Sequence, residues 1–448
     1  MKRAAKKPAH ADAWEKLLTR HKNREKEVVI DSSFHNAALI VSHDLAGTFG
    51  WDEFRSCVVL RSVLPSVAGF ESQGLAQVEG QPLTDTDVKL VDAYLAREWR
   101  LDLSHTTVAS AITMAAKGAS FHPVTEWLVT LRWDKTPRID TWLIDFCGVE
   151  DTPYSRKVAA WFLCGAVGRV CTPGVKHDEM LVLEGLQGRG KSKAFRALAG
   201  EWFSDSPLEM GSKDRFIQLR GNWIVEIAEL DGFTKAEVTK VKAYMSSSVD
   251  DYRPPFAMTN IKAPRQCVFA GTVNENEYLH DATGGRRFYP VKVTKQIDHE
   301  GIAMVREQLW AEALERWSAD SSWRFQSADY EAAKVEQEAR RKVDPWEPGI
   351  DKWASEASGH VTIQRILFEH LGLSRDRWGR VEETRVGKCL TALGWIPKQI
   401  RVQGVRVRVY CRVDPGTDPG VSQPSQPVTT CADSARCDSS EACSEAFG

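Results

Sequence analysis

Long apolar runs are missing from the 448-residue sequence: none approaches the ~20 residues that a membrane-spanning helix needs. The lysine-rich amino terminus, MKRAAKKPAHADAWEK, lacks the apolar segment of a secretory signal. The ten cysteines include no CxxC pair, which argues against a zinc ribbon or a disulfide scaffold and favours a reducing cytoplasm. With 42% hydrophobic and 27% charged residues and a formal net charge of only −2, the composition is that of a soluble globular protein.

A chain of 448 residues is too long for one ordinary core, so two or three domains are expected. Short apolar strands alternate with helices over residues 173–325, which indicates an α/β core with parallel strands. The other predicted segments are a basic flexible arm at 1–30, a mainly helical region at 31–172, a helical connector at 326–349, a basic winged-helix-like domain at 350–412 and a disordered tail at 413–448.

The stretch LEGLQGRGKS contains a full GxxxxGK[ST] pattern, preceded by a short apolar strand and followed by a predicted helix. Gly185, Gly188 and Gly190 would let backbone N–H groups wrap phosphates, and the helix N-terminus would add partial positive charge. Lys191 would reach the β- and γ-phosphates of ATP, and the Ser192 hydroxyl would ligate Mg²⁺. The alternative is a chance match in a glycine-rich turn. The strand and helix around the pattern favour the phosphate-binding loop.

The stretch GNWIVEIAELDGF places carboxylates in and directly after an apolar strand. A buried carboxylate costs several kcal/mol unless a partner or a metal compensates for it. At the carboxyl end of a strand beside the phosphate loop, a metal and water would offset that cost. We therefore predict that Glu229 polarises the attacking water and that Glu226 supports Mg²⁺ or pairs with a basic residue. An edge strand with one exposed face remains the alternative.

Two later segments add candidates for the same site. The apolar strand VFAGT leads to Asn274, whose amide could bind the γ-phosphate or the attacking water; Asn276 is the weaker candidate, and a turn-forming Asn is the alternative. In DATGGRRFYPV, Arg286 or Arg287 could reach the γ-phosphate of a neighbouring subunit as a trans-acting finger. The alternative for these arginines is a solvated surface turn. The sequence does not show which of the two arginines would be the finger.

These motifs together resemble the virulence-associated protein E family. The resemblance covers roughly residues 85–410 and includes HPVTEWLVTLRWDKTPRIDTWL, LVLEGLQGRGKS, WIVEIAELDGF, YRPPF, PRQCVFAGTVNENEYL and TGGRRFYPV. It implies a phage, prophage or pathogenicity-island ATPase, similar in motifs to superfamily 3 replicative helicases, which are AAA+-like hexameric rings. The implied roles are Walker A for Lys191 and Ser192, Walker B for Glu229, sensor for Asn274 and arginine finger for Arg286 or Arg287. The usual adjacent Walker B acids are here spaced as Glu226 and Glu229, so the metal-side acid stays open.

Two regions are candidates for contact with nucleic acid. The first is SSSVDDYRPPFAMTNIKAPRQ, between the second and third core strands, where ring helicases carry a pore-lining insertion. Arg253, Lys262 and Arg265 are its candidates for phosphate contacts, with Phe256 as an apolar tip, and Lys242 in the preceding helix could face nucleotide or DNA. A purely structural loop is the alternative.

The second region runs from residue 361 to residue 412, where eleven basic residues minus four acidic ones leave a local charge of +7. Its order of helix, turn, helix and two alternating strands is typical of a winged helix. We predict phosphate binding by basic side chains on its second helix and strands; a solvated protein-docking module is the alternative. The candidates are Arg385, Lys388, Arg401, Arg406 and Arg408.

The sequence thus predicts an α/β P-loop NTPase core of AAA+-like type with a helical N-terminal region and a C-terminal winged-helix-like domain. Its predicted function is an ATP-hydrolysing, Mg²⁺-dependent ring motor, a replicative helicase of a phage, prophage or related mobile element. The expected partners are DNA, which would be single-stranded in the pore, and further copies of the chain in a ring, which the resemblance implies is a hexamer. Whether a separate primase also takes part stays open. One alternative is an ATP-switched DNA-binding regulator or replication initiator without unwinding activity, and another is a phosphotransferase.

Overall fold

The computed structural model describes residues 13–64, 80–207, 213–254, 259–274, 285–319, 322–358, 360–402 and 405–412. The chain divides into two compact units, Met1–Lys342 and Val343–Gly448. The predicted connector at 326–349 spans this division. No helix in the described ranges is both long and apolar enough to cross a membrane.

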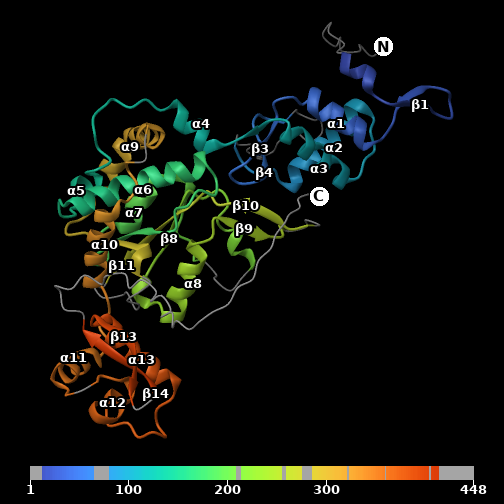
Figure 1. Ribbon diagram of the computed structural model, residues 1–448. Coiled ribbons are helices and arrows are strands. Elements are labelled where there is room, and N and C mark those ends of the chain that lie inside the picture. The colour runs from blue at the N-terminus through green and yellow to red at the C-terminus, as the bar shows by residue number, and fades with distance from the viewer. Residues whose placement is uncertain are drawn as a thin grey trace, which may run out of the picture. The chain divides into compact units, whose positions relative to one another are not determined.

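The first unit begins with a small subdomain of helices and short strands around its own apolar core (Figure 1). Ile40, Leu95 and Ile112, one from each main helix, are fully buried there. β3 pairs antiparallel with β4 and parallel with β5. The elements are η1 (Ala13–Leu17), β1 (Arg20–Lys22), β2 (Val28–Ile30), α1 (Phe34–His43), β3 (Phe49–Asp52), β4 (Cys57–Leu60), α2 (Asp85–Trp99), α3 (His105–Lys117) and β5 (Ser120–Phe121).

A five-stranded parallel sheet forms the centre of the first unit, in the order β12-β6-β11-β8-β7. Nearly every residue of these strands is buried, which is expected when helices cover both faces of a parallel sheet. The prediction of an α/β core with parallel strands is confirmed. The strands are β6 (Met180–Glu184), β7 (Phe203–Ser204), β8 (Ile224–Ile227), β11 (Val268–Val273) and β12 (Phe288–Lys292).

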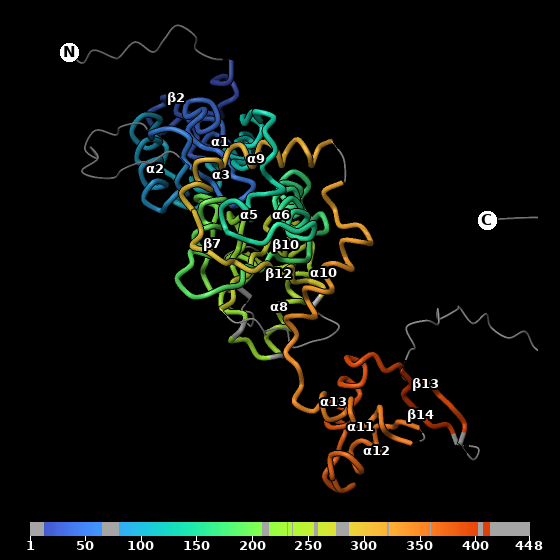
Figure 2. Tube along the Cα trace, turned by 90° about the vertical axis from the view of Figure 1, so that its left-hand side faces the viewer, coloured from blue at the N-terminus to red at the C-terminus, as the bar shows by residue number. Residues whose placement is uncertain are grey.

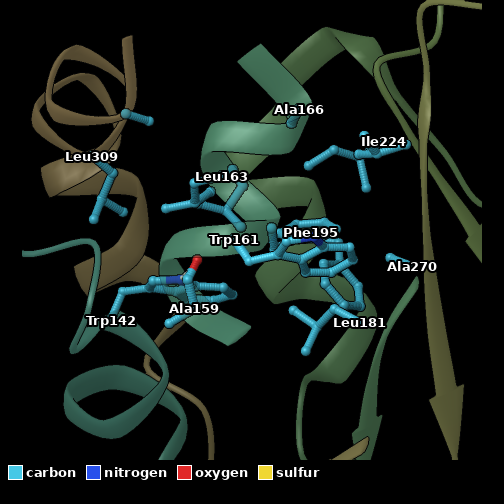
Figure 3. Packing of buried hydrophobic residues seen from close by; sticks show 14 of the residues in the cluster. Trp142, Ala159, Trp161, Leu163, Ala166, Leu181, Phe195, Ile224, Ala270 and Leu309 are labelled. Carbon is cyan, nitrogen blue, oxygen red and sulfur yellow. Dashed lines mark hydrogen bonds between the residues drawn. The ribbon is translucent and has the colours of Figure 1, made fainter. Parts of the chain in front are cut away.

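Alternate residues of each strand enter two different apolar clusters. Leu181, Ile224 and Ala270 point into the cluster that α6, α7 and α9 complete (Figure 3). Val182 and Phe269 belong to the opposite cluster, which α8 covers. The period of two along each strand therefore separates the faces. The helices and remaining strands are α4 (Pro123–Thr130), α5 (Trp142–Cys147), α6 (Pro153–Cys171), α7 (Lys191–Ala199), η2 (Gly200–Trp202), η3 (Lys213–Phe216), η4 (Leu230–Gly232), α8 (Lys235–Met245), β9 (Val249–Tyr252), β10 (Ile261–Pro264), η5 (Gly285–Arg287), α9 (His299–Ala319) and α10 (Ser327–Ala339).

The second unit packs helices against an antiparallel hairpin, as Figure 2 shows. Ile350, Ile366, Val386 and Leu390 are fully buried in its own apolar cluster. The unit contains α11 (Glu347–Glu356), α12 (Ile363–Arg365), the π-helix η6 (Ile366–His370), α13 (Arg380–Ala392), β13 (Trp395–Val402) and β14 (Val405–Arg412).

Candidate nucleotide site and nucleic-acid contacts

The glycine-rich loop lies between the end of β6 and the start of α7. Gly185 has φ 150°, and a Cβ at this position would lie 2.9 Å from the carbonyl oxygen of Val293, so only glycine fits. Gly188 and Gly190 have φ values of 84° and 83°, and Gly190 is the N-cap of α7. The loop therefore reaches the N-terminus of α7 through backbone conformations that favour glycine.

Lys191 is the first residue of α7, and its side chain turns back over the loop. Its Nζ donates to the carbonyl oxygens of Gly185, at 2.5 Å, and Leu186, at 3.1 Å. Nζ also donates to Oδ1 of Asn274 at 3.0 Å. Asn274 directly follows β11, the strand beside β6. The fold thus brings two of the predicted site residues into direct contact.

Glu226, on β8, is only 3% exposed and connects three segments of the site. Its Oε1 accepts hydrogen bonds from Ser192 Oγ at 2.8 Å and from Thr272 Oγ1 at 2.7 Å. Its Oε2 is also buried, and no described residue bonds it. Thr272 is not among the residues predicted from the sequence; its hydroxyl within the apolar run VFAGTV, two residues before Asn274, is the signal that could have revealed it.

The orphaned Glu226 Oε2 and the Ser192 hydroxyl form a small set of hard oxygen donors, which suits Mg²⁺. The described residues include no group of three or more His, Cys, Asp or Glu side chains that could hold a metal by itself. A Mg²⁺ ion bound by one carboxylate, one hydroxyl and the oxygens of a nucleotide needs no such group, because Mg²⁺ in nucleotide sites is held mainly by phosphates and water. The residues present fit the ion.

Glu229 lies just past β8 and is exposed. Its φ of 53° is unusual for a residue other than glycine and turns the chain sharply at the carboxyl end of the strand. Glu229 therefore follows the carboxyl end of β8, at the same edge of the parallel sheet as the 185–190 loop, and does not share the buried bonds that hold Glu226. This separates the two predicted acids by environment: Glu226 is buried and bonded, and Glu229 is open to solvent.

The two candidate finger arginines differ in their surroundings. Arg287 is partly buried, and its Nε lies 3.6 Å from Oδ2 of Asp178 in the same chain. Arg286, its neighbour in η5, is exposed. Asn276, the weaker sensor candidate, lies outside the described residues, as does Phe256.

A family model described as the virulence-associated protein E-like domain matches residues 128–342. Residues 128–342 of the chain are therefore similar to that domain. The resemblance predicted from the motifs is thereby confirmed over these residues. No curated protein sequence matches the chain.

Several solved structures also match the chain. Three are titled as apo structures of the NrS-1 C terminal region; two of these titles give residues 305–718, and two name an A form. They share 12–14% sequence identity with this chain at TM-scores of 0.36–0.38, over 63–64% of this chain and 77–78% of theirs. Likenesses at this level carry no statement about activity.

The virulence-associated protein E-like domain includes the β9–β10 hairpin, where the structure corrects one prediction. Arg265 is 2% exposed, and its guanidinium pairs with the carboxylate of Asp250 and donates to the carbonyl oxygen of Tyr244 at 2.5 Å. A buried, paired arginine offers no surface to a phosphate, so Arg265 does not belong to the DNA-contacting set. Lys262, on β10 of the same hairpin, is exposed.

The two other candidates of this part of the domain have different environments. Arg253 is exposed at the end of β9. Lys242, on α8, is buried, and its Nζ lies 5.6 Å from the centre of the Phe288 ring. Because its side chain is buried, Lys242 is unsuited to contact DNA directly.

Three of the candidate basic residues of the second unit lie on the β13–β14 hairpin. Arg401 and Arg406 lie directly opposite each other, and both are exposed, as is Arg408. Directly opposed side chains share one face of an antiparallel pair, and like charges there repel each other. The hairpin therefore concentrates positive charge on one face, as its alternating sequence predicts.

The two candidates on α13 are arranged differently. Arg385 bonds both carboxylate oxygens of Asp344, at 2.8 and 2.9 Å, and its guanidinium lies 3.8 Å from the centre of the Trp346 ring. Lys388, one turn further on, is exposed. Arg385 therefore has a structural role within the unit, whereas Lys388 is open to a ligand.

Proposed function

We propose that this protein is an ATP-hydrolysing motor that acts on DNA, a replicative helicase of a phage, prophage or related mobile element. One observation carries the proposal: Lys191, Ser192, Glu226 and Asn274 meet through direct hydrogen bonds at the carboxyl ends of β6, β8 and β11. Open α/β sheets bind their ligands at that edge. A glycine loop, a lysine, a buried carboxylate and an amide are the parts that phosphoryl transfer from ATP requires there.

Each side chain has a role that follows from its surroundings. The loop amides and Lys191 hold the β- and γ-phosphates, whose charged oxygens are stronger acceptors for the ammonium than neutral carbonyls. Ser192 and Glu226 would hold Mg²⁺, whose contribution there would be to neutralise charge on the phosphates. Glu229, exposed beside them, orients the attacking water, and Asn274 binds the γ-phosphate or that water.

Arg286 is the better candidate for an arginine finger, because Arg287 already pairs with Asp178 in its own chain. An exposed arginine can enter the site of a neighbouring copy and stabilise the transition-state charge. The proposal therefore includes a homo-oligomeric ring, a hexamer by the family resemblance, in which ATP is hydrolysed between subunits.

DNA contacts are proposed at two places. Arg253 and Lys262 belong to the β9–β10 region, which would line the pore and hold one strand. In the second unit, which we interpret as a winged-helix-like domain, the exposed face of Arg401, Arg406 and Arg408, with Lys388 on α13, would bind backbone phosphates.

Strand displacement tests the proposal against the alternative of an ATP-switched DNA-binding regulator. A forked DNA duplex with one labelled strand is mixed with the full-length protein, Mg²⁺ and ATP, and the released strand is measured over time. A motor releases the strand with wild type and does not release it with Lys191→Ala. If wild type binds the fork and hydrolyses ATP without releasing the strand, the helicase is ruled out in favour of the regulator.

A further inference from the structure

A cavity of about 100 Å³ lies beside the carboxyl end of β12, at the edge of the parallel sheet. The lining includes Val149 from the segment before α6, Tyr154 and Ser155 from the start of α6, Val291 and Lys292 from β12, and Arg340, the residue after α10. None of these side chains belongs to the phosphate-binding set described above. The cavity is therefore a separate feature of the same sheet edge.

Direct bonds tie the walls of this cavity to the 185–190 loop. Arg340 Nε donates to both carboxylate oxygens of Glu184, at 2.9 and 3.0 Å, and Glu184 is the residue before the loop. The Val293 amide, between the lining residues Lys292 and Thr294, donates to the Glu184 carbonyl oxygen at 2.8 Å. Arg189, inside the loop, donates to the carbonyl oxygen of Thr294, a lining residue. Loop and cavity are thus neighbours at the strand ends, where open α/β sheets bind ligands.

The cavity has a polar group that lacks a partner. Tyr154 is only 8% exposed, and no described residue bonds its buried hydroxyl. Burial raises the pKa of this hydroxyl well above its usual value, so it keeps its proton and can donate. A buried hydroxyl without a partner costs stability, which a hydrogen-bonding ligand would recover.

The remaining lining favours an uncharged, flat ligand over an anion. Lys292 and Arg340 supply positive charge, and Glu150 and Glu336 match it with negative charge. Arg340 is moreover already paired with Glu184 and Glu336. The lining also contains apolar residues, among them Val149 and Pro290, so part of the wall suits a ring. A site of balanced charge with an apolar wall and a free donor fits a nucleobase and its ribose.

We propose that this cavity receives the nucleoside part of the nucleotide whose phosphates the 185–190 loop holds, with the Tyr154 hydroxyl as a hydrogen-bond donor to it. The inference rests on the proposed function, because it requires a nucleoside triphosphate on that loop. It adds a site for the part of the nucleotide that the phosphate-binding residues cannot reach.

Calorimetric titration separates the two parts of the ligand. The full-length protein, with Mg²⁺ present, is titrated with ATP and, separately, with inorganic tripolyphosphate. Tyr154→Phe removes only the hydroxyl and is expected to weaken ATP binding roughly three- to tenfold, the worth of one hydrogen bond, while tripolyphosphate binds as in wild type. Tyr330→Phe is the matched control, because Tyr330 is exposed on α10 and does not line the cavity.

A second variant tests the site sterically. Lys292→Trp places a large ring at the exposed rim of the cavity and should weaken the binding of ATP without affecting the binding of tripolyphosphate. Lys292→Gln only removes the charge and should bind ATP nearly as tightly as wild type does. The inference is overturned if wild type binds ATP no tighter than tripolyphosphate, or if both Tyr154→Phe and Lys292→Trp bind ATP like wild type. In either case, binding of tripolyphosphate would show that the 185–190 loop still holds phosphates, so the proposed function would stand without the nucleoside site. If neither ligand binds wild type, the proposed function fails as well.

Discussion

Replacing Asp250 by Asn should destabilise the first unit by about 3–5 kcal/mol, because it leaves the buried Arg265 guanidinium without its counter-charge. The side chains of Arg265 and Asp250 are 1% and 6% exposed. Nε of Arg265 donates to Oδ2 of Asp250 at 3.2 Å, and Nη2 bonds the other carboxylate oxygen. An Asn amide retains one acceptor and loses the charge. The expected loss is a large share of the 5–15 kcal/mol that folded domains typically possess.

Urea unfolding followed by tryptophan fluorescence measures this loss, with Asp251→Asn as the control. Asp251 is the next residue of β9 but is exposed, and its carboxylate accepts a bond from the Asn260 amide at 3.3 Å. We expect the control to lie within about 0.5 kcal/mol of wild type. Equal urea midpoints for the two variants would refute the buried ion pair. If an Arg265 variant kept its stability and lost DNA binding, the prediction that Arg265 contacts phosphate would be reinstated.

Three further predictions concern charge. Burial, with a smaller effect of Arg169, lowers the pKa of His177, so below pH ~6.5 the unfolded chain binds a proton that the native chain does not. The free energy of unfolding should therefore decrease as the pH is lowered, by up to about 1.4 kcal/mol per pH unit, which urea unfolding at pH 7.5 and 5.5 measures. Arg401→Ala and Arg406→Ala should each weaken duplex DNA binding and reduce the slope of log K against log salt by roughly 0.9 per lost phosphate contact, measured by fluorescence anisotropy. Arg286→Ala should lower steady-state ATP turnover roughly 10³-fold or more, as loss of an arginine finger does.

Each of these has a matched control and a contradicting result. His177→Gln should lose the pH dependence, and an unchanged dependence would show that another group titrates. Arg365→Ala should leave the salt slope unchanged, because Arg365 bonds the Glu369 carboxylate at 2.7 and 2.8 Å; an equal decrease would mean that the hairpin face is not the contact. Arg287→Ala should retain more turnover than the Arg286 variant, and the reverse order would assign the finger to Arg287.

The sequence allowed the central part of the site to be predicted because its residues follow parallel strands. The carboxyl ends of such strands meet at one edge, so Lys191, Glu226 and Asn274 could be expected near one another before any distance was known. Thr272 was missed because a threonine in a strand is ordinary. Only the fold shows that its hydroxyl points at Glu226.

Two features depend on contacts that local patterns do not contain. Arg265 looked like a surface cation because its partner Asp250 is fifteen residues earlier and meets it only through the antiparallel pairing of β9 and β10. The cavity beside β12 is assembled from the start of α6, the end of β12 and the end of α10, which are far apart in the chain. Periodicity predicts each of these elements but not which of their ends adjoin.

The most direct test of the account is ATP hydrolysis by the full-length protein, with and without single-stranded DNA, for wild type, Lys191→Ala and Glu229→Gln. Lys193→Ala serves as the control, because Lys193 is the exposed lysine two residues further along α7. We predict that DNA stimulates wild type and the control several-fold and that the other two variants are inactive. A wild-type protein that hydrolyses no ATP under either condition, or a Lys191→Ala variant that hydrolyses it as fast as wild type, would contradict the central claim.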